Sequence, residues 1–142
     1  MKNRRLAREN AVKMLYQIEM SGYKPEDCIN VYWDAEREDK EEVKSYSNYI
    51  VRGVIANIDE IDDKIEKLSK SWALDRMHKV DKAILRLAAY ELLYSKDVPY
   101  KVAINEAIEL AKKFGTDDSK AFINGILDKF YHFYVLKKQK EE

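Results

Sequence analysis

The chain contains few of the residues that interrupt helices. Four glycines and two prolines occur among its 142 residues. A β-sandwich or β-barrel needs many tight turns, and such turns draw heavily on these two residue types. The shortage therefore predicts an all-α fold in which helices are joined by short loops. The length suits one domain with a hydrophobic core of its own.

The overall charge excludes one class of protein. The 26 lysines and arginines balance 26 aspartates and glutamates, so the formal net charge is zero. A uniformly basic coat for nucleic acid is excluded, and any binding of RNA or DNA must come from a local patch. Cys28 is the only cysteine, which excludes an internal disulfide and fits a cytoplasmic protein. We find neither the apolar run of a signal peptide nor the ~20 apolar residues of a membrane helix.

Apolar residues recur at helical spacing along the first half. They predict a helix over residues 3–20, a second that begins at Pro25, and two consecutive helices over residues 43–68. The break between the last two is expected near Asn57, with Asp59 as the N-cap of the second. A coiled coil over the same stretch is the alternative, but it would need further heptads.

The second half has a different pattern. Residues 80–94 are apolar on more than one face, which predicts a central, mostly buried helix. A helix over residues 101–114 is expected to end at Gly115 in a left-handed cap. The polar run 116–119 then supplies capping groups for a last helix that ends near Tyr134.

We therefore expect about seven helices in two packed helical subdomains. The subdomains would span about residues 1–74 and 75–136, and residues 137–142 would fray. The residues expected to be mostly buried are Trp72, Ile84, Leu85, Leu87, Ala88, Ile104, Ile108, Phe122 and Ile126.

Catalytic motifs are missing from the sequence. It contains no glycine-rich phosphate-binding motif, no zinc-protease motif and no nucleophile elbow. Asp128 and His132 lie at i, i+4, but two ligands do not make a metal site, and a surface ion pair is the simpler interpretation. Cys28 lies among aromatic and branched residues and is expected to be a small buried hydrophobe. We expect no enzyme activity, no cofactor and no metal.

The amino-terminal helix carries a local excess of positive charge. Residues 1–13 have a net charge of +4, from Lys2, Arg4, Arg5, Arg8 and Lys13 against Glu9. On a helix, Arg5, Arg8 and Tyr16 share a stripe beside the apolar face. Guanidinium groups bind phosphates, and a tyrosine ring can stack on an unpaired base. The stripe indicates single-stranded nucleic acid; an ordinary solvated helix face is the alternative.

The start of the last helix is a second candidate. Its free N–H groups could bind a phosphate, and Phe122 lies in the first turn. Asp117 and Asp118, however, place negative charge at that position. Their ordinary role is helix capping, and near RNA they would accept protons from base amino or hydroxyl groups.

Three stretches carry residues in a combination typical of one protein family. The first is Arg4-Arg5-Leu6-Ala7-Arg8-Glu9-Asn10-Ala11, followed by Leu15-Tyr16-Gln17. The second contains Trp72, Leu74, Arg76, Asp81, Ile84-Leu85-Arg86-Leu87-Ala88 and Tyr90-Glu91-Leu92. The third includes Pro99, Val102-Ala103-Ile104-Asn105-Glu106-Ala107, Ser119, Phe122 and Asn124-Gly125-Ile126-Leu127-Asp128. Together they cover residues 4–130 and resemble the NusB family of bacterial transcription antitermination factors; only residues 23–45 have no recognisable counterpart.

This resemblance implies a function and partners. NusB-like proteins bind the boxA element of nascent ribosomal RNA transcripts together with NusE, which is ribosomal protein ten of the small subunit. The complex joins elongating RNA polymerase with other Nus factors. The family occurs as monomers and as homodimers, and the sequence leaves both open. The RNA-binding positions correspond here to Lys2, Arg4, Arg5, Arg8, Tyr16, Asp118 and Phe122, and Asp81 corresponds to a position toward NusE.

Two alternatives stay open at this point. A protein-only helical adaptor would keep the core pattern but would not need the cationic stripe. The other alternative is the NusB-like RNA-binding module of an RNA cytosine methyltransferase. Those enzymes continue into a Rossmann-like catalytic domain with a catalytic cysteine, whereas this sequence ends at residue 142 without such a segment.

Overall fold

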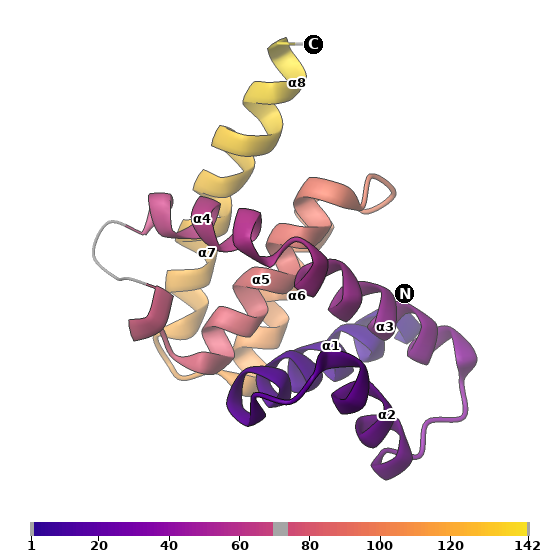
Figure 1. The fold of residues 1–142 in the computed structure, drawn as a ribbon. Helices are drawn as coiled ribbons and strands as arrows, with labels where there is room; N and C mark the ends of the chain where they lie inside the picture. Colours follow the sequence, from indigo (N-terminus) through magenta and orange to yellow (C-terminus); the bar gives the residue numbers. More distant parts are fainter. Residues whose placement is uncertain (1, 70–73, 142) are drawn as a thin grey trace.

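The computed structural model describes residues 2–69 and 74–141, and all regular secondary structure in these ranges is helical (Figure 1). This confirms the all-α prediction. No described helix is both long and apolar enough to cross a membrane. The elements are α1 (Lys2–Ser21), α2 (Pro25–Ala35), α3 (Glu41–Ala56), α4 (Ile58–Leu68), a 3-10 turn (Leu74–Arg76), α5 (Lys79–Tyr94), α6 (Tyr100–Phe114), α7 (Ser119–Phe130), a π-helix (Tyr131–Leu136) and α8 (Lys137–Glu141).

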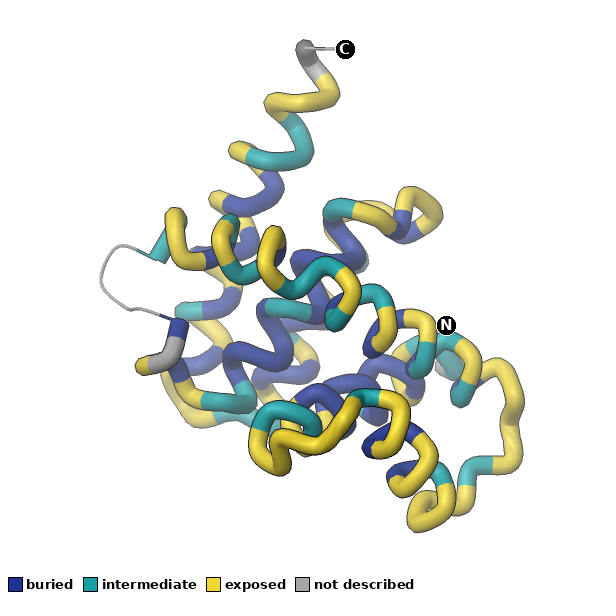
Figure 2. The backbone as a smooth tube through the Cα atoms, viewed as in Figure 1, coloured by how far each residue is buried: buried dark blue, intermediate teal, exposed yellow. Residues whose placement is uncertain are grey.

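Helix α5 forms the centre of the molecule. It packs against α1, α3, α4, α6 and α7, and it is buried along most of its length (Figure 2). Ile84 and Leu85 have no exposed surface, as a helix that is apolar on more than one face requires. The sequence prediction for residues 80–94 is therefore confirmed.

Most of the predicted core is buried. Ile84, Leu85, Leu87, Ala88 and Ile126 lie in the hydrophobic core. Ile104, Ile108 and Phe122 are only partly buried, because they lie where α6 and α7 turn from the core toward solvent. Trp72 lies outside the described residues.

Helix boundaries follow local signals in the first half. Gly22 ends α1 with a φ of +71°, a left-handed conformation that suits glycine, and Pro25 occupies the first turn of α2. The break between α3 and α4 falls at Asn57, as predicted, but Asp59 is not the N-cap. The backbone N–H and side-chain amide of Asn57 both donate to the carbonyl of Gly53, so α4 begins directly after Asn57.

Two predictions for the second half are wrong. Gly115 has a φ of −91°, and its small size is needed for another reason. A Cβ at this position would lie 2.5 Å from the hydroxyl oxygen of Ser119. The last helix also does not stop near Tyr134, because α7 continues through the π-helix into α8, which ends at Glu141; fraying of the tail stays a prediction. Lys137 donates its N–H to the carbonyl of His132, so helical hydrogen bonding continues across the junction.

The division into subdomains at residues 74 and 75 stays a prediction. Apolar side chains from both halves join one hydrophobic cluster, and α5 contacts helices of both. Cys28 is buried and free, as expected for a small hydrophobe.

A row of tyrosines fastens α3 to α5. The rings of Tyr46, Tyr49, Tyr90 and Tyr94 follow one another with centroid separations of 5.6, 5.5 and 5.3 Å. The Tyr90 ring lies over the backbone of α3 at Gly53, where an added Cβ would come within 2.1 Å of the ring. Only glycine permits this approach without moving the ring.

Gly53→Ala is therefore expected to destabilise the protein by about 1–3 kcal/mol, as overpacking of a filled core does. Urea unfolding followed by circular dichroism measures the change. Gly125→Ala is the matched control, because Gly125 lies within α7 and a Cβ there meets no atom within 4 Å. It should add ~0.5–1 kcal/mol of stability through helix propensity. Equal effects of the two substitutions would contradict the close packing at Gly53.

Candidate nucleic-acid interface

Helix α1 presents its arginines at very different depths. Its apolar face packs inward through Ala7, Ala11 and Met14, none of which is exposed. The side chain of Arg5 is 56% exposed and that of Arg4 37%, whereas that of Arg8 is only 4% exposed. The side chain of Lys2 lies outside the described set. The predicted cationic stripe is thus exposed at Arg4 and Arg5 and buried at Arg8.

Arg8 belongs to a buried ion pair with Glu91 of α5. Its Nε lies 3.0 Å from both carboxylate oxygens of Glu91, and Glu106 of α6 is 3.5 Å away. Tyr46 of α3 donates its hydroxyl to the same Glu91 carboxylate. Burial is the largest single influence and lowers the pKa of Arg8, but the hydrogen bond to Glu91 and the attraction of the carboxylates of Glu91 and Glu106 together leave that pKa raised. The prediction that Arg8 contacts a phosphate is corrected accordingly, because its guanidinium is enclosed by carboxylates.

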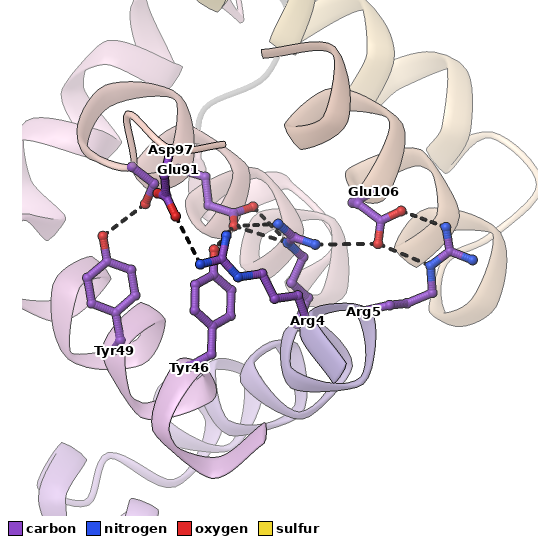
Figure 3. Close-up of polar contacts among 9 residues, drawn as sticks. Arg4, Arg5, Tyr46, Tyr49, Glu91, Asp97 and Glu106 are labelled. Carbon is purple, nitrogen blue, oxygen red and sulfur yellow. Dashed lines mark hydrogen bonds and ion pairs between the residues drawn. The ribbon is translucent and has the colours of Figure 1, made fainter. Parts of the chain in front are cut away.

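The two exposed arginines also have carboxylate partners (Figure 3). Arg4 lies 2.9 Å from Asp97 in the turn between α5 and α6, and its guanidinium lies over the ring of Tyr46 at 4.4 Å. Arg5 donates two hydrogen bonds to Glu106, of 3.1 and 2.6 Å. In the Arg5 pair the arginine is the exposed partner, whereas in the Arg4 pair the carboxylate of Asp97 is more exposed than the guanidinium.

These pairs shift the pKa of the carboxyl groups. The hydrogen bond from Arg5 lowers the pKa of Glu106, and the hydrogen bond from Arg4 lowers the pKa of Asp97. A depressed folded-state pKa means that the ionised carboxylate stabilises the fold at neutral pH. That contribution is lost as the pH falls through the folded-state pKa.

A small pocket joins three residues that the sequence analysis treated separately. Its volume is about 340 Å³, and it is lined by Arg76, Met77, His78, Asp81, Thr116, Asp118 and Phe122. Asp81 comes from the first turn of α5, while Asp118 and Phe122 come from the start of α7. Sequence spacing could not reveal this proximity, because it arises from the packing of α5 against α7.

Asp81 is the unusual member of this pocket. The residue is 3% exposed, and its Oδ1 has no hydrogen-bond partner among the described residues. A buried acceptor without a donor carries a desolvation cost that a donor from a ligand would relieve. Asp81 thus shares a pocket with the RNA candidates Asp118 and Phe122, and its position toward NusE stays a prediction.

The acids at the start of α7 do not cap the helix with their side chains. Asp118 occupies the N-cap position without a side-chain capping hydrogen bond and is exposed. The hydroxyl oxygen of Ser119 accepts the N–H of Thr116 at 2.9 Å, which ties the helix start to the preceding loop. The capping interpretation of Asp118 is thus wrong, and its carboxylate is available to a ligand.

Tyr16, the aromatic candidate of the cationic stripe, is 38% exposed on α1.

A second ion cluster, which the sequence analysis missed, lies beside Asp81. Glu19 of α1 is 2.8 Å from Lys82 and 3.0 Å from Arg86, and Arg86 also donates two hydrogen bonds to Asp62 of α4. Lys82 is almost fully buried. The cluster ties α1 and α4 to α5 and holds the start of α5 in place. The only signal of this cluster in the sequence was the presence of charged residues within the otherwise apolar helix α5.

Over residues 2–69 and 74–141, no group of three or more potential ligands is placed to hold a metal ion. His132 and Asp128 are 3.6 Å apart, and both side chains are more than half exposed, as expected for a surface pair.

Comparison with known proteins identifies the family. The model of the NusB family matches residues 5–132. The chain belongs to the NusB family. A transcription antitermination protein NusB of Anaeromyxobacter sp. (strain Fw109-5) is 51% identical over 123 residues, which cover 87% of this chain and 85% of that protein. Membership of the family assigns the chain to transcription antitermination.

Solved structures agree with this assignment. NusB of T. maritima is 36% identical, covers 98% of this chain and 97% of its own, and superposes with a TM-score of 0.86. A second structure contains the antitermination factors NusB and NusE in complex with double-stranded RNA. Its matching chain is 27% identical, with a TM-score of 0.87 and coverage of 94% of this chain and 99% of that one.

The buried pair of Arg8 and Glu91 generates a stability prediction. Glu91→Gln removes the counter-charge but keeps the shape, so a buried guanidinium loses its main partner. Breaking a buried pair in this way typically costs about 3–5 kcal/mol, which chemical denaturation measures. Glu26→Gln is the matched control: Glu26 accepts two hydrogen bonds of 2.9 Å from Arg52, but both side chains are more than half exposed. Its cost should stay below ~1 kcal/mol, and similar costs for both variants would contradict the argument.

Proposed function

We propose that this protein binds boxA RNA of nascent ribosomal RNA transcripts together with NusE and acts with it on elongating RNA polymerase. The observation that carries the proposal is the pocket where Asp81, Asp118 and Phe122 meet. It offers a ring and two carboxylates in a chain of the NusB family. The protein would act in the cytoplasm by binding, without catalysis, and either as a monomer or as a homodimer.

The phosphate contacts would come from the start of α1. Arg4 and Arg5 expose their guanidinium groups, and Lys2 precedes them in the same helix. An RNA phosphate can replace or share the carboxylates of Asp97 and Glu106, because guanidinium groups bind both anions in the same fork geometry. Arg8 is left out of this set and serves the fold instead.

Base recognition would come from aromatic rings and acids. Tyr16 on α1 and Phe122 in the pocket can each stack on an unpaired base. The unpartnered oxygen of Asp81 and the free carboxylate of Asp118 would accept hydrogen bonds from base amino groups. Such contacts favour a single strand, because the bases of a duplex are already stacked on one another.

The phosphate contacts predict how binding depends on salt. In the double variant Arg4→Gln/Arg5→Gln, the slope of log K against log salt should fall by about 1.4, at ~0.7 for each contact on a single strand. Fluorescence anisotropy with labelled boxA RNA at several salt concentrations measures the slope. An unchanged slope would reduce the basic start of α1 to an ordinary solvated helix face.

A base-stacking contact should have the opposite signature. Tyr16→Ala is expected to weaken boxA binding by about 1–3 kcal/mol with little change in the salt slope, because the ring carries no charge. A duplex of the same sequence is the control, and its affinity should hardly respond to the substitution. Equal losses on single strand and duplex would rule out stacking by Tyr16.

The proposal also predicts cooperation with NusE. The three clustered positive charges of Lys2, Arg4 and Arg5 hold RNA weakly, so a specific complex needs contacts from a second protein. We expect NusE to tighten boxA binding by a coupling free energy of about 1–3 kcal/mol, and boxA to tighten the protein pair by the same factor. Titrations of each component with and without the third measure both quantities. If the protein pair forms but leaves boxA affinity unchanged, the cooperative mechanism is wrong; a chain that binds NusE but no boxA RNA would be a protein-only adaptor.

A further inference from the structure

A second hollow, larger than the pocket at Asp81, lies at the other end of α5. Its volume is about 700 Å³, and it lies between α4, the end of α5, the α5–α6 turn and the C-terminal π-helix and α8. In Figure 1 the α5–α6 turn and α8 project on the same side of the molecule. We refer to it as the tyrosine groove after four of its lining residues, which are Tyr94, Tyr100, Tyr131 and Tyr134.

The groove combines aromatic rings with positive charge. Tyr100 stacks on the buried Tyr131 with centroids 3.7 Å apart and an interplanar angle of 10°, while 37% of Tyr100 remains exposed. Three lysines line the same hollow, namely Lys64, Lys96 and Lys138. The single acidic lining residue among those described, Glu60, accepts the hydroxyl of Tyr94.

The groove is continuous with the arginine end of α1. The α5–α6 turn contributes Lys96, Val98 and Pro99 to the groove lining, and between them Asp97 forms the ion pair with Arg4 at 2.9 Å. A strand that contacts Arg4 therefore reaches Lys96 by passing a single residue of the turn. The pocket of Asp81 lies at the opposite end of α5 from the groove. An RNA strand bound at the arginines can therefore enter the groove with only one of its two ends.

We propose that the tyrosine groove binds single-stranded RNA that flanks boxA on one side. The lysines neutralise its phosphates, and the open face of Tyr100 stacks on a base. The positive excess of the lining favours RNA over an uncharged peptide. This inference rests on the proposed function, because the flanking RNA is delivered by the segment bound at α1.

The test compares three RNAs: boxA alone, boxA with about six uridines added at the 5′ end, and boxA with the same addition at the 3′ end, a length typical of single-strand sites. One extension, and not the other, should tighten binding about tenfold, as one stacked base and two phosphate contacts would do. Its salt slope should be steeper by about 1.4.

Variants locate the effect in the groove. Lys96→Gln/Lys138→Gln should remove the added slope, and Tyr100→Leu should remove most of the added affinity; both should bind boxA alone as the wild type does. Lys24→Gln/Lys67→Gln is the matched control, since it loses the same charge from exposed lysines outside the groove lining and should keep the full gain. Thermal unfolding of each variant confirms that it is folded.

The possible results separate the two proposals. If boxA alone binds and neither extension is tighter, or if the groove variants keep the gain, the groove proposal is wrong and the boxA proposal stands. If the groove variants instead weaken NusE binding and leave the gain intact, the groove is a protein surface and the RNA assignment is overturned. If boxA alone does not bind, the proposed function fails, and the groove proposal fails with it.

Discussion

The carboxylate of Glu91 is the group on which the rest of the structure depends. It lies within an otherwise apolar central helix and is almost fully buried, and there it receives Arg8 from α1 and Tyr46 from α3. A charge at that depth is tolerated only when it is paired and hydrogen-bonded. Three helices are thus fixed relative to one another by one polar contact. The arginines that remain exposed on α1 owe their positions to it.

Helix α5 separates the small pocket at Asp81 from the ion pair of Arg4 and Asp97 and keeps the two at a fixed distance. Its first turn supplies Asp81 to the small pocket, and the turn after its last residue supplies Asp97 to Arg4. The ion cluster around Glu19 holds the first end, and the tyrosine row with Gly53 holds the second. A rigid helix between these two ends would suit the proposed binding of an extended strand, because the contacts need no rearrangement to be made together.

The sequence predicted the helices well and the site less well, for physical reasons. Periodicity identifies the face of a helix, so α1, the break at Asn57 and the buried α5 were predicted correctly. It does not give depth: Arg5 and Arg8 share a stripe, yet only the structure shows that Glu91, distant in the sequence, draws Arg8 inside. Asp118 looked like a cap because of its position, but Ser119 makes the local hydrogen bond. The pocket at Asp81 depends on tertiary packing, which no local pattern encodes.

The shared carboxylate also limits how this sequence can drift. A neutral residue at position 91 leaves the guanidinium of Arg8 without its main partner in the interior, and a neutral residue at position 8 leaves a buried carboxylate supported mainly by Tyr46. Each single step is costly, although replacing both charges by apolar groups of similar volume can be nearly neutral. Positions 8 and 91 are therefore expected to be inherited as a unit. A lineage that replaces both residues must either pass through a poorly folding single variant or change both positions at once.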